Sequence, residues 1–388
     1  MEINNNNPTA AYIEGCAGVI YKGKIYFTTF YPVGCLYSFD LKSKTTEFLK
    51  RFPVDNDNVM CHMGAVLHGN EAWFVANGVC RVLCVNLDTL ETEFFDIPNH
   101  DYMNATGFVD YLIYDEDKLV MIPCGHALDT LMIVNMSDHS VESFFHVIPN
   151  KKCIGAYLHE DEIRFLSTDG KLIAVFNLTK RESVIVNREK DPVEWGFSSL
   201  VQGGSEVYLI PRDYGEIGVL RPESDELIRV SIPNPGCSYC GGLMLKEGLL
   251  MLGWRDDRGE IPTDSDGRQM TECVFLTLKD SSAREIRFPH GPVGRVQEYM
   301  TLVGEADGMH VIMGSDGNIF FVDDEAGIKE VIEYSIEADA ELSTPIIERH
   351  FSFEVIKNVR NGMVIEDDYM SLETFVDTVA KNAGTWRE

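Results

Sequence analysis

The chain has 388 residues, of which 45% are hydrophobic and 24% are charged, and this composition is typical of a globular protein. Its 62 acidic and 33 basic residues give a formal net charge of -29, and no basic patch interrupts that excess. Because an acidic surface repels phosphate groups and anionic lipids, nucleic acid and membrane surfaces are excluded as expected partners.

The chain begins with a run of Asn residues that lacks apolar neighbours, so residues 1–10 are predicted to be disordered. No apolar run approaches the roughly 18 residues that span a bilayer, and no basic segment leads into an apolar one at the start. The ten cysteines are scattered along the chain, which favours reduced, buried thiols over a disulfide scaffold. We therefore expect a cytoplasmic protein.

One pattern repeats from residue 11 onward. The segment LYSFDLKSKTTEF at 36–48 is echoed by LCVNLDTLETEFF at 83–95, where Asn86 takes the place of Asp40. Each copy holds two apolar strands joined by a tight turn, then a third strand that ends in a polar turn, and a fourth strand. The first turn of the seven copies is centred on Gly23, Gly69, Glu116 and Asp117, Glu160 and Asp161, Gly203 and Gly204, Glu247 and Gly248, and Asp307 and Gly308.

A fixed period of about 40–50 residues with four strands in each copy is typical of a β-propeller. We therefore predict an all-β protein, a seven-bladed β-propeller of four-stranded antiparallel blades over residues 11–345. A single sheet of four strands cannot cover both of its faces, whereas sheets stacked around a ring cover each other. Two closures of the ring stay open: residues 11–14 complete the seventh blade, or a strand at 351–358 adds an edge.

The segment VIYKGKIYF at 19–27, followed by the hairpin at 36–48, resembles the kelch-like repeat in its layout. This resemblance covers roughly residues 11–335 and implies a propeller. Kelch repeats carry Gly-Gly after the second strand, whereas this chain carries Thr28-Thr29, Ala76-Asn77 or Gly253-Trp254. No functional residue is carried over from the resemblance.

Residues 346–388 leave the pattern and are predicted to form a C-terminal hairpin and an amphipathic helix. Asn361-Gly362 is a strong two-residue turn. Ser371 is suited to cap a helix whose apolar residues recur with helical spacing at Leu372, Phe375, Val376 and Val379. We expect this helix to dock on the propeller, with binding of a partner as the alternative.

The inner strands carry two columns of residues when the repeats are aligned on their second strands. One column is small except at Tyr111, as crowding near an axis requires, and contains Ala17, Gly64, Gly155, Ser199, Gly241 and Thr301. Two residues earlier, near the mouth of the channel, a varied column contains Gly15, His62, Val109, Cys153, Phe197, Tyr239 and Tyr299.

Aromatic, basic and acidic residues gather around that predicted mouth, and such a mixture is typical of a small-molecule or sugar pocket. The predicted ligand-binding residues are His62, His126, Trp195, Arg212, Asp213, Tyr214, Tyr239, Trp254, Arg255, Asp256, Glu298 and Tyr299.

Neither a metal nor a cofactor is expected. The longest insertion, residues 253–273, contains Asp264, Asp266 and Glu272 but misses the spacing of a calcium loop. The single C-x-x-C motif, Cys237 to Cys240, lacks the second pair of ligands that a zinc site requires. Signature motifs of hydrolases, metalloproteases and nucleotide-binding proteins are also absent from the sequence.

The sequence favours a non-catalytic binding module that recognises a protein or carbohydrate-like ligand on its loop face. The alternative is a propeller-fold glycan hydrolase or lyase that uses rim carboxylates, with Asp213, Asp256 and Glu298 as candidates and Arg212 or Arg255 holding a substrate carboxylate. An enzyme of that kind needs two carboxyl groups within about 10 Å of each other, one of them with a raised pKa.

Overall fold

The computed structural model describes most of the chain between residues 13 and 336. The described residues are 13–32, 34–52, 61–77, 81–98, 108–123, 128–148, 153–186, 196–212, 215–224, 226–232, 238–254, 265, 270–280, 282–289 and 300–336. The predicted C-terminal hairpin and helix at 346–388 lie outside the described residues, as does the N-terminal segment 1–10.

The regular structure of the described residues consists of β-strands, without a helix. Accordingly, this part of the chain has no helix with the length and hydropathy needed to cross a membrane. The strands group in chain order into seven sheets of four antiparallel strands, which confirms the predicted seven-bladed β-propeller.

The first four blades occupy residues 14–185. Blade 1 contains β1 (Glu14–Tyr21), β2 (Lys24–Tyr31), β3 (Cys35–Asp40) and β4 (Thr45–Arg51). Blade 2 contains β5 (Cys61–His68), β6 (Glu71–Asn77), β7 (Arg81–Asn86) and β8 (Thr92–Asp96). Blade 3 contains β9 (Phe108–Tyr114), β10 (Lys118–Pro123), β11 (Leu131–Asn135) and β12 (Val141–Phe144). Blade 4 contains β13 (Cys153–His159), β14 (Glu162–Ser167), β15 (Leu172–Asn177) and β16 (Glu182–Ile185).

The remaining three blades occupy residues 197–333. Blade 5 contains β17 (Phe197–Gly203), β18 (Glu206–Pro211), β19 (Glu216–Arg221) and β20 (Glu226–Ser231). Blade 6 contains β21 (Ser238–Met244), β22 (Gly248–Trp254), β23 (Met270–Thr277) and β24 (Ala283–Pro289). Blade 7 contains β25 (Met300–Ala306), β26 (Met309–Gly314), β27 (Asn318–Val322) and β28 (Ile328–Glu333).

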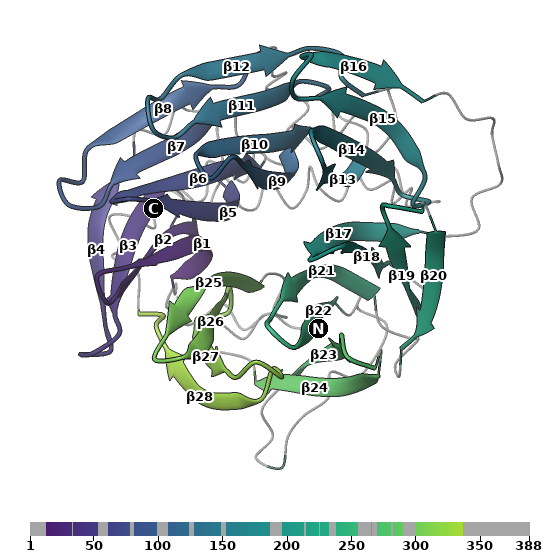
Figure 1. Cartoon of the computed structure of the whole chain (residues 1–388). Helices are drawn as coiled ribbons and strands as arrows, with labels where there is room; N and C mark the ends of the chain where they lie inside the picture. Colours follow the sequence, from purple (N-terminus) through teal and green to yellow (C-terminus); the bar gives the residue numbers. More distant parts are fainter. Residues whose placement is uncertain are drawn as a thin grey trace, which may run out of the picture. The chain divides into compact units, whose positions relative to one another are not determined.

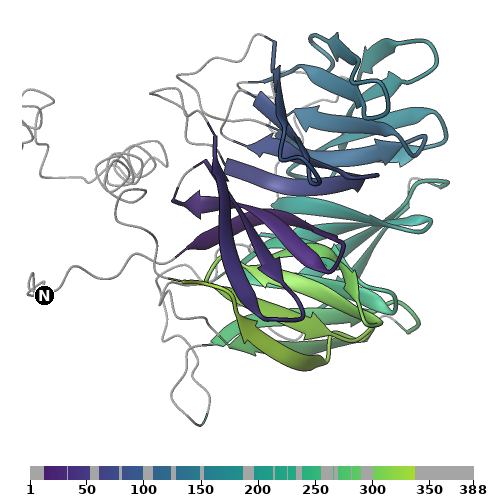
Figure 2. The same cartoon turned by 90° about the vertical axis from the view of Figure 1, so that its left-hand side faces the viewer.

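The first strands of the blades follow one another around a common centre, and the fourth strands lie on the outside (Figure 1). Because neighbouring strands run in opposite directions, the two ends of the ring carry different connections. We call the end with the first-to-second and third-to-fourth strand turns the turn face. The opposite end, with the second-to-third strand connections and those between blades, is the loop face. The side view shows the twist of the sheets (Figure 2).

The Asp or Asn that ends the third strand in blades 1 to 4 has a local structural cause. In blade 1, Asp40 Oδ1 accepts hydrogen bonds from the backbone N–H groups of Lys42 and Ser43 at 2.9 and 2.8 Å. In blade 2, Asn86 Oδ1 does the same for the two N–H groups that follow its turn residue Leu87. In these blades, a short side-chain acceptor thus holds the turn between the third and fourth strands.

The apolar core lies between adjacent blades. Trp73 and Phe74 belong to one buried cluster that joins blades 1, 2 and 3. Further clusters join blades 3 and 4, blades 4 and 5, blades 5 and 6, and blades 6 and 7. Since fully burying a large apolar side chain is worth about 1.5–3 kcal/mol, each sheet is stabilised mainly by its two neighbours.

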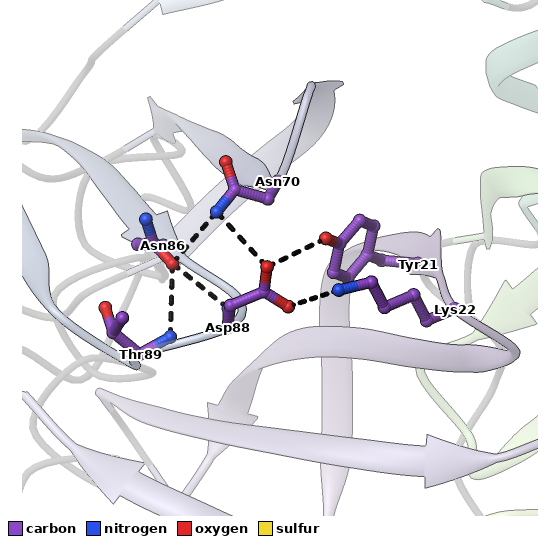
Figure 3. A network of polar contacts seen from close by, with 6 residues as sticks. All are labelled: Tyr21, Lys22, Asn70, Asn86, Asp88 and Thr89. Atoms are coloured by element: carbon purple, nitrogen blue, oxygen red, sulfur yellow. Dashed lines mark hydrogen bonds and ion pairs between the residues drawn. The ribbon is translucent and has the colours of Figure 1, made fainter.

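Polar contacts join adjacent blades on the turn face. Between blades 1 and 2, Asp88 accepts hydrogen bonds from Lys22 Nζ at 2.7 Å and from Tyr21 Oη at 3.1 Å (Figure 3). Asn70 donates to Asn86 Oδ1 and Asp88 Oδ2 in the same network. The turn between β7 and β8 of blade 2 is thereby joined to the turn between β1 and β2 of blade 1.

Side-chain contacts between one blade and the preceding one recur at other junctions of the ring. In three blades, the fourth residue after the Asp or Asn that ends the third strand has a positive φ, and its basic side chain reaches an acidic residue on the fourth strand of the preceding blade. The pairs are Lys44 with Glu330, His139 with Glu93 and Arg181 with Glu142.

The ring is closed by contacts between residues 13–15 and residues 334–336. Ile13 N–H donates to Ile336 O at 3.2 Å, and Ser335 Oγ donates to Ile13 O at 2.8 Å. Tyr334 Oη accepts from Gly15 N–H and donates to Gly314 O, both at 2.8 Å. Blade 7 takes all four strands from residues 300–333, so Glu14 belongs to blade 1 and does not complete blade 7; residues 351–358 lie outside the described residues.

Candidate functional site

Most of the predicted ligand-binding residues belong to connections on the loop face. Eight of them lie outside the described residues: His126, Trp195, Asp213, Tyr214, Arg255, Asp256, Glu298 and Tyr299. Two more are described as backbone only, Tyr239 at the loop-face end of β21 and Trp254 at the end of β22. Ligand binding by these ten residues stays a prediction.

His62 lies near the loop-face end of β5, the inner strand of blade 2, and is buried, with 1% of its surface exposed. Its Nδ1 is 3.0 Å from Thr28 Oγ1 of blade 1, and its Nε2 has no hydrogen-bond partner among the described residues. Burial lowers the pKa of His62 to about 3, so its imidazole is neutral at physiological pH. A ligand would reach it only by displacing its surroundings.

Arg212 follows β18 on the loop face and is exposed. Its backbone N–H donates to Gly196 O at 2.8 Å, which fixes the connection without engaging the guanidinium. The structure therefore presents Arg212 at the predicted face, and its role in holding an acidic substrate group stays a prediction.

Strand register corrects the sequence alignment at blade 3. The turn between β9 and β10 has three residues, 115–117, whereas the turn between β1 and β2 has two, so alignment on the second strands displaces the inner strand by one. Asp110, paired with Ile122, therefore takes the small-residue position expected at Tyr111. Phe108 takes the position expected at Val109. In blade 7, Met300 pairs with Gly314 at the position expected at Tyr299.

Asp110 is a half-buried carboxyl group on the inner strand β9, two residues from its loop-face end. Burial raises the pKa of Asp110 to about 7, although hydrogen bonds from the backbone N–H groups of Tyr111 and Ala156 oppose the shift. Near neutral pH, the group therefore exists both as an acid and as a carboxylate. The sequence alignment missed it because of the longer turn in blade 3.

Glycine at the neighbouring inner strands makes room for Asp110 and Tyr111. A Cβ atom on Gly155 of blade 4 would lie 2.9 Å from Asp110 Oδ2, and Gly155 has a φ of 150°. A Cβ atom on Gly64 of blade 2 would overlap the Tyr111 ring. Glycine in the small-residue column thus leaves space for side chains of blade 3 on both sides of that blade. This is a structural reason for glycine at these two positions.

A second polar cluster lies on the turn face between blades 2 and 3. His139 Nε2 is 3.0 Å from Glu71 Oε2, and His139 Nδ1 is 2.7 Å from Glu93 Oε2. Burial opposes the charged imidazole, but the hydrogen bonds to Glu93 and Glu71 outweigh it and raise the pKa of His139. Sequence reasoning missed this cluster because its members come from four different elements.

Cys84 completes that cluster from β7, where it is buried with 3% of its surface exposed. Burial, followed by the charges of Glu71 and Glu93, raises the pKa of the Cys84 thiol. One donor atom each from Glu71, Cys84 and His139 lie within 4.8 Å of one another, which makes these residues a candidate metal-ligand set among the described residues.

The predicted buried thiols are confirmed where the structure describes them. Free, buried cysteines are found at Cys16, Cys35, Cys84, Cys153 and Cys273. Cys237 lies outside the described residues and Cys240 is described as backbone only, so the C-x-x-C motif stays untested. The same holds for the insertion 253–273, of which mainly the strand ends are described.

The blades, their order and the central inner strands place this protein in the class of seven-bladed β-propellers. No model of a known protein family matches the chain, and no curated protein matches its sequence. Structural comparison finds many solved structures that match this fold.

Three of those structures illustrate the similarity. A catalytically inactive virginiamycin B lyase from Staphylococcus aureus, with quinupristin, is 13% identical with a TM-score of 0.52 over 84% of this chain and 97% of that one. The β-propeller domain of Cps50 (Swd1) from Myceliophteria thermophila is 11% identical, with a TM-score of 0.54 over 79% and 96%. PorZ of Porphyromonas gingivalis is 12% identical, with a TM-score of 0.57 over 86% and 40%. Such identities establish the fold alone.

Proposed function

We propose that this protein is a non-catalytic binding module that captures a protein or carbohydrate-like ligand at the loop-face end of its channel. The observation that carries the proposal is Asp110, a carboxyl group at the inner-strand position where the other blades carry small residues. Nothing in the packing of a propeller requires an acidic group there, because Ala, Gly, Ser and Thr fill the equivalent positions in the other blades.

The chemistry of Asp110 favours a ligand rich in hydroxyl groups. With a pKa of about 7, the group donates a hydrogen bond as an acid and accepts hydrogen bonds as a carboxylate. A hydroxyl group also donates and accepts, so either protonation state of Asp110 finds a partner on a sugar. The exposed Arg212 on the same face adds a donor suited to an acidic sugar.

The test is capture of ligands by the full-length protein on an array of immobilised neutral and acidic oligosaccharides, followed by calorimetry on the best binder. Replacing a ligand-contacting carboxyl removes a charge-assisted hydrogen bond, so Asp110→Ala is expected to weaken binding by about tenfold or more. Asp88→Asn on the turn face is the matched control and should bind as the wild type does. Binding that Asp110→Ala leaves unchanged would remove Asp110 from the site.

A glycan hydrolase or lyase is the second candidate, and the raised pKa of Asp110 is the observation that favours it. A general acid of a glycosidase requires such a shift, but also a second carboxyl at a suitable distance. The candidates for that partner, Asp213, Asp256 and Glu298, lie outside the described residues. The test is whether the protein releases reducing ends from an oligosaccharide that it binds. If it does, and if Asp110→Asn abolishes that release, the protein is an enzyme and the proposal of a non-catalytic binding module is wrong.

The other features of the proposal follow from composition. We propose a cytoplasmic location, which suits the five buried free cysteines. The net charge of -29 argues against nucleic acid and anionic membranes as partners. Kinship with kelch-like repeats is proposed for the layout of the strands only.

A further inference from the structure

The junction between blades 2 and 3 departs from the pattern of its sister junctions. In the pairs Lys44 with Glu330 and Arg181 with Glu142, a basic side chain of one blade meets an acidic one of the preceding blade. His139 and Glu93 hold the same two positions between blades 2 and 3. A Lys or Arg therefore satisfies the structural role of this position, and a histidine there needs another explanation.

The residue opposite Glu93 is also exceptional. Glu93 pairs in register with Cys84, whereas the equivalent Glu330 pairs with Phe321 and Glu142 pairs with Ile133. Glu71 begins the second strand of blade 2, where blades 4 and 5 also carry a glutamate, so its carboxylate is already in place beside Cys84 and His139. A thiol and an imidazole thus replace residues without ligand character at one junction, next to a carboxylate.

The side chains of Glu71, Cys84 and His139 converge. Their donor atoms lie within 4.8 Å of one another, and the Nε2 of His139 is 3.0 Å from Oε2 of Glu71. Ligand atoms around a tetrahedral zinc ion, at bond lengths of about 2.0–2.3 Å, lie roughly 3.3–3.7 Å apart. A movement of about 1 Å or less by the Cys84 sulfur relative to the other two donors brings the set to that spacing.

The surroundings of His139 orient it as a metal ligand. Glu93 Oε2 lies 2.7 Å from Nδ1, which leaves Nε2 directed at Glu71, and a carboxylate on the far nitrogen is the usual support for a metal-bound histidine. The rings of Trp73 and Phe95 lie edge-on to the imidazole, with centroids at 5.1 and 6.1 Å. These buried rings fix the imidazole plane from the apolar side.

We propose that Glu71, Cys84 and His139 form a binding site for a divalent transition metal, with zinc as the best match, that joins blades 2 and 3. A thiolate excludes magnesium and calcium, which prefer oxygen ligands, and zinc accepts sulfur, nitrogen and oxygen together. His139 and Glu71 keep 29% and 21% of their side-chain surfaces exposed, so an ion reaches the site from the turn face. Three protein ligands leave a fourth position for water.

This inference differs from the sequence expectation of no metal. That expectation depended on ligand spacing along the chain, whereas residues 71, 84 and 139 belong to two blades and meet only when the blades stack. The site is on the turn face and is independent of the proposed ligand site at the loop face.

The first experiment adds Co²⁺ and then Zn²⁺ to the purified, full-length protein after treatment with a chelator. We expect one metal ion per chain, a thiolate-to-cobalt charge-transfer band in the near ultraviolet, and a rise in melting temperature with Zn²⁺. His139→Lys is the decisive variant, because it reproduces the ion pair of the sister junction and removes the imidazole. It is expected to fold and to lose metal affinity by about 100-fold or more.

Matched controls separate ligation from folding. Cys84→Ser is expected to abolish the charge-transfer band, whereas Cys273→Ser, which alters another buried cysteine on a third strand, should retain it. Glu93→Gln should weaken binding by about 10- to 100-fold, as loss of a supporting carboxylate does. No stoichiometric binding by the wild type, or a band and an affinity that His139→Lys and Cys84→Ser leave unchanged, would overturn the proposal.

Discussion

Two titratable residues at the loop-face end of the channel have pKa values shifted toward the neutral form. Burial lowers the pKa of His62 to about 3 and raises that of Asp110 to about 7. The physical cause is the same for both, since a charge is less stable away from water. Near neutral pH, His62 is therefore uncharged and Asp110 is only partly ionised, on a chain with a net charge of -29.

The shift at His62 predicts sensitivity to acid. Its folded pKa lies below the unfolded value of 6.5, so between the two values the unfolded chain binds a proton that the native protein does not. Stability is therefore complete above pH 6.5 and falls as the pH decreases, by about 2 kcal/mol from this residue at pH 5. Urea denaturation at pH 7 and pH 5 should show that His62→Gln loses less stability than the wild type over this interval.

The comparison of the two pH values cancels any constant effect of placing Gln in the buried site. Equal losses of unfolding free energy in the wild type and His62→Gln would mean that His62 is protonated in the folded protein, contrary to its burial.

At the scale of the elements, the sequence predicts what is local. The four strands of each blade follow from alternating apolar residues. In blades 1 to 4, the third strand ends in an Asp or Asn, and Asp40 and Asn86 show that this residue holds the next turn. These causes lie within a few residues of their effects. The number of blades and the order of the strands could be predicted from the sequence for that reason.

The candidate sites were harder to predict from the sequence, because they depend on the register of the strands and on the packing between blades. One extra turn residue before β10 moves Asp110 to the position predicted for Tyr111. Glu71, Cys84 and His139 meet because blade 3 packs against blade 2, and the spacing of these residues along the sequence does not indicate that contact. Of the predicted rim residues, His62 and Arg212 have described side chains, and one is buried while the other is exposed.

Ring closure can be tested at Tyr334, whose hydroxyl links blade 7 to blade 1. Tyr334→Phe removes a buried acceptor from Gly15 N–H and a donor to Gly314 O, both at 2.8 Å. Leaving buried polar groups without partners is expected to cost about 1–3 kcal/mol of unfolding free energy. Chemical denaturation measures the change, and Tyr21→Phe, which loses one exposed hydrogen bond to Asp88, should cost about 0.5 kcal/mol or less. A similar loss of unfolding free energy in both variants would mean that the Tyr334 hydroxyl does not hold the ring closed.

At the scale of the whole molecule, two electrostatic effects oppose each other. Ion pairs on the turn face join blades, as Lys22 with Asp88 and Lys246 with Asp324 do, but they are largely exposed. Exposed pairs of this kind contribute about 0–1 kcal/mol each, and salt weakens them. Against them stands the excess of acidic residues: even if all 33 basic residues were paired, 62 minus 33 leaves 29 acidic residues without a partner.

Because repulsion among so many like charges acts over longer distances than the pairs do, we expect salt to stabilise this protein. Raising sodium chloride from 20 to 200 mM shortens the screening length from about 20 Å to below 10 Å, which weakens the repulsion between blades. The melting temperature at pH 7.5 should rise by about 2 °C or more. The same titration near pH 4.6, the isoelectric point, is the control and should show little or no rise, since the net charge is then close to zero. A melting temperature that falls with salt at pH 7.5 would mean that the turn-face ion pairs outweigh the net charge in holding the ring together.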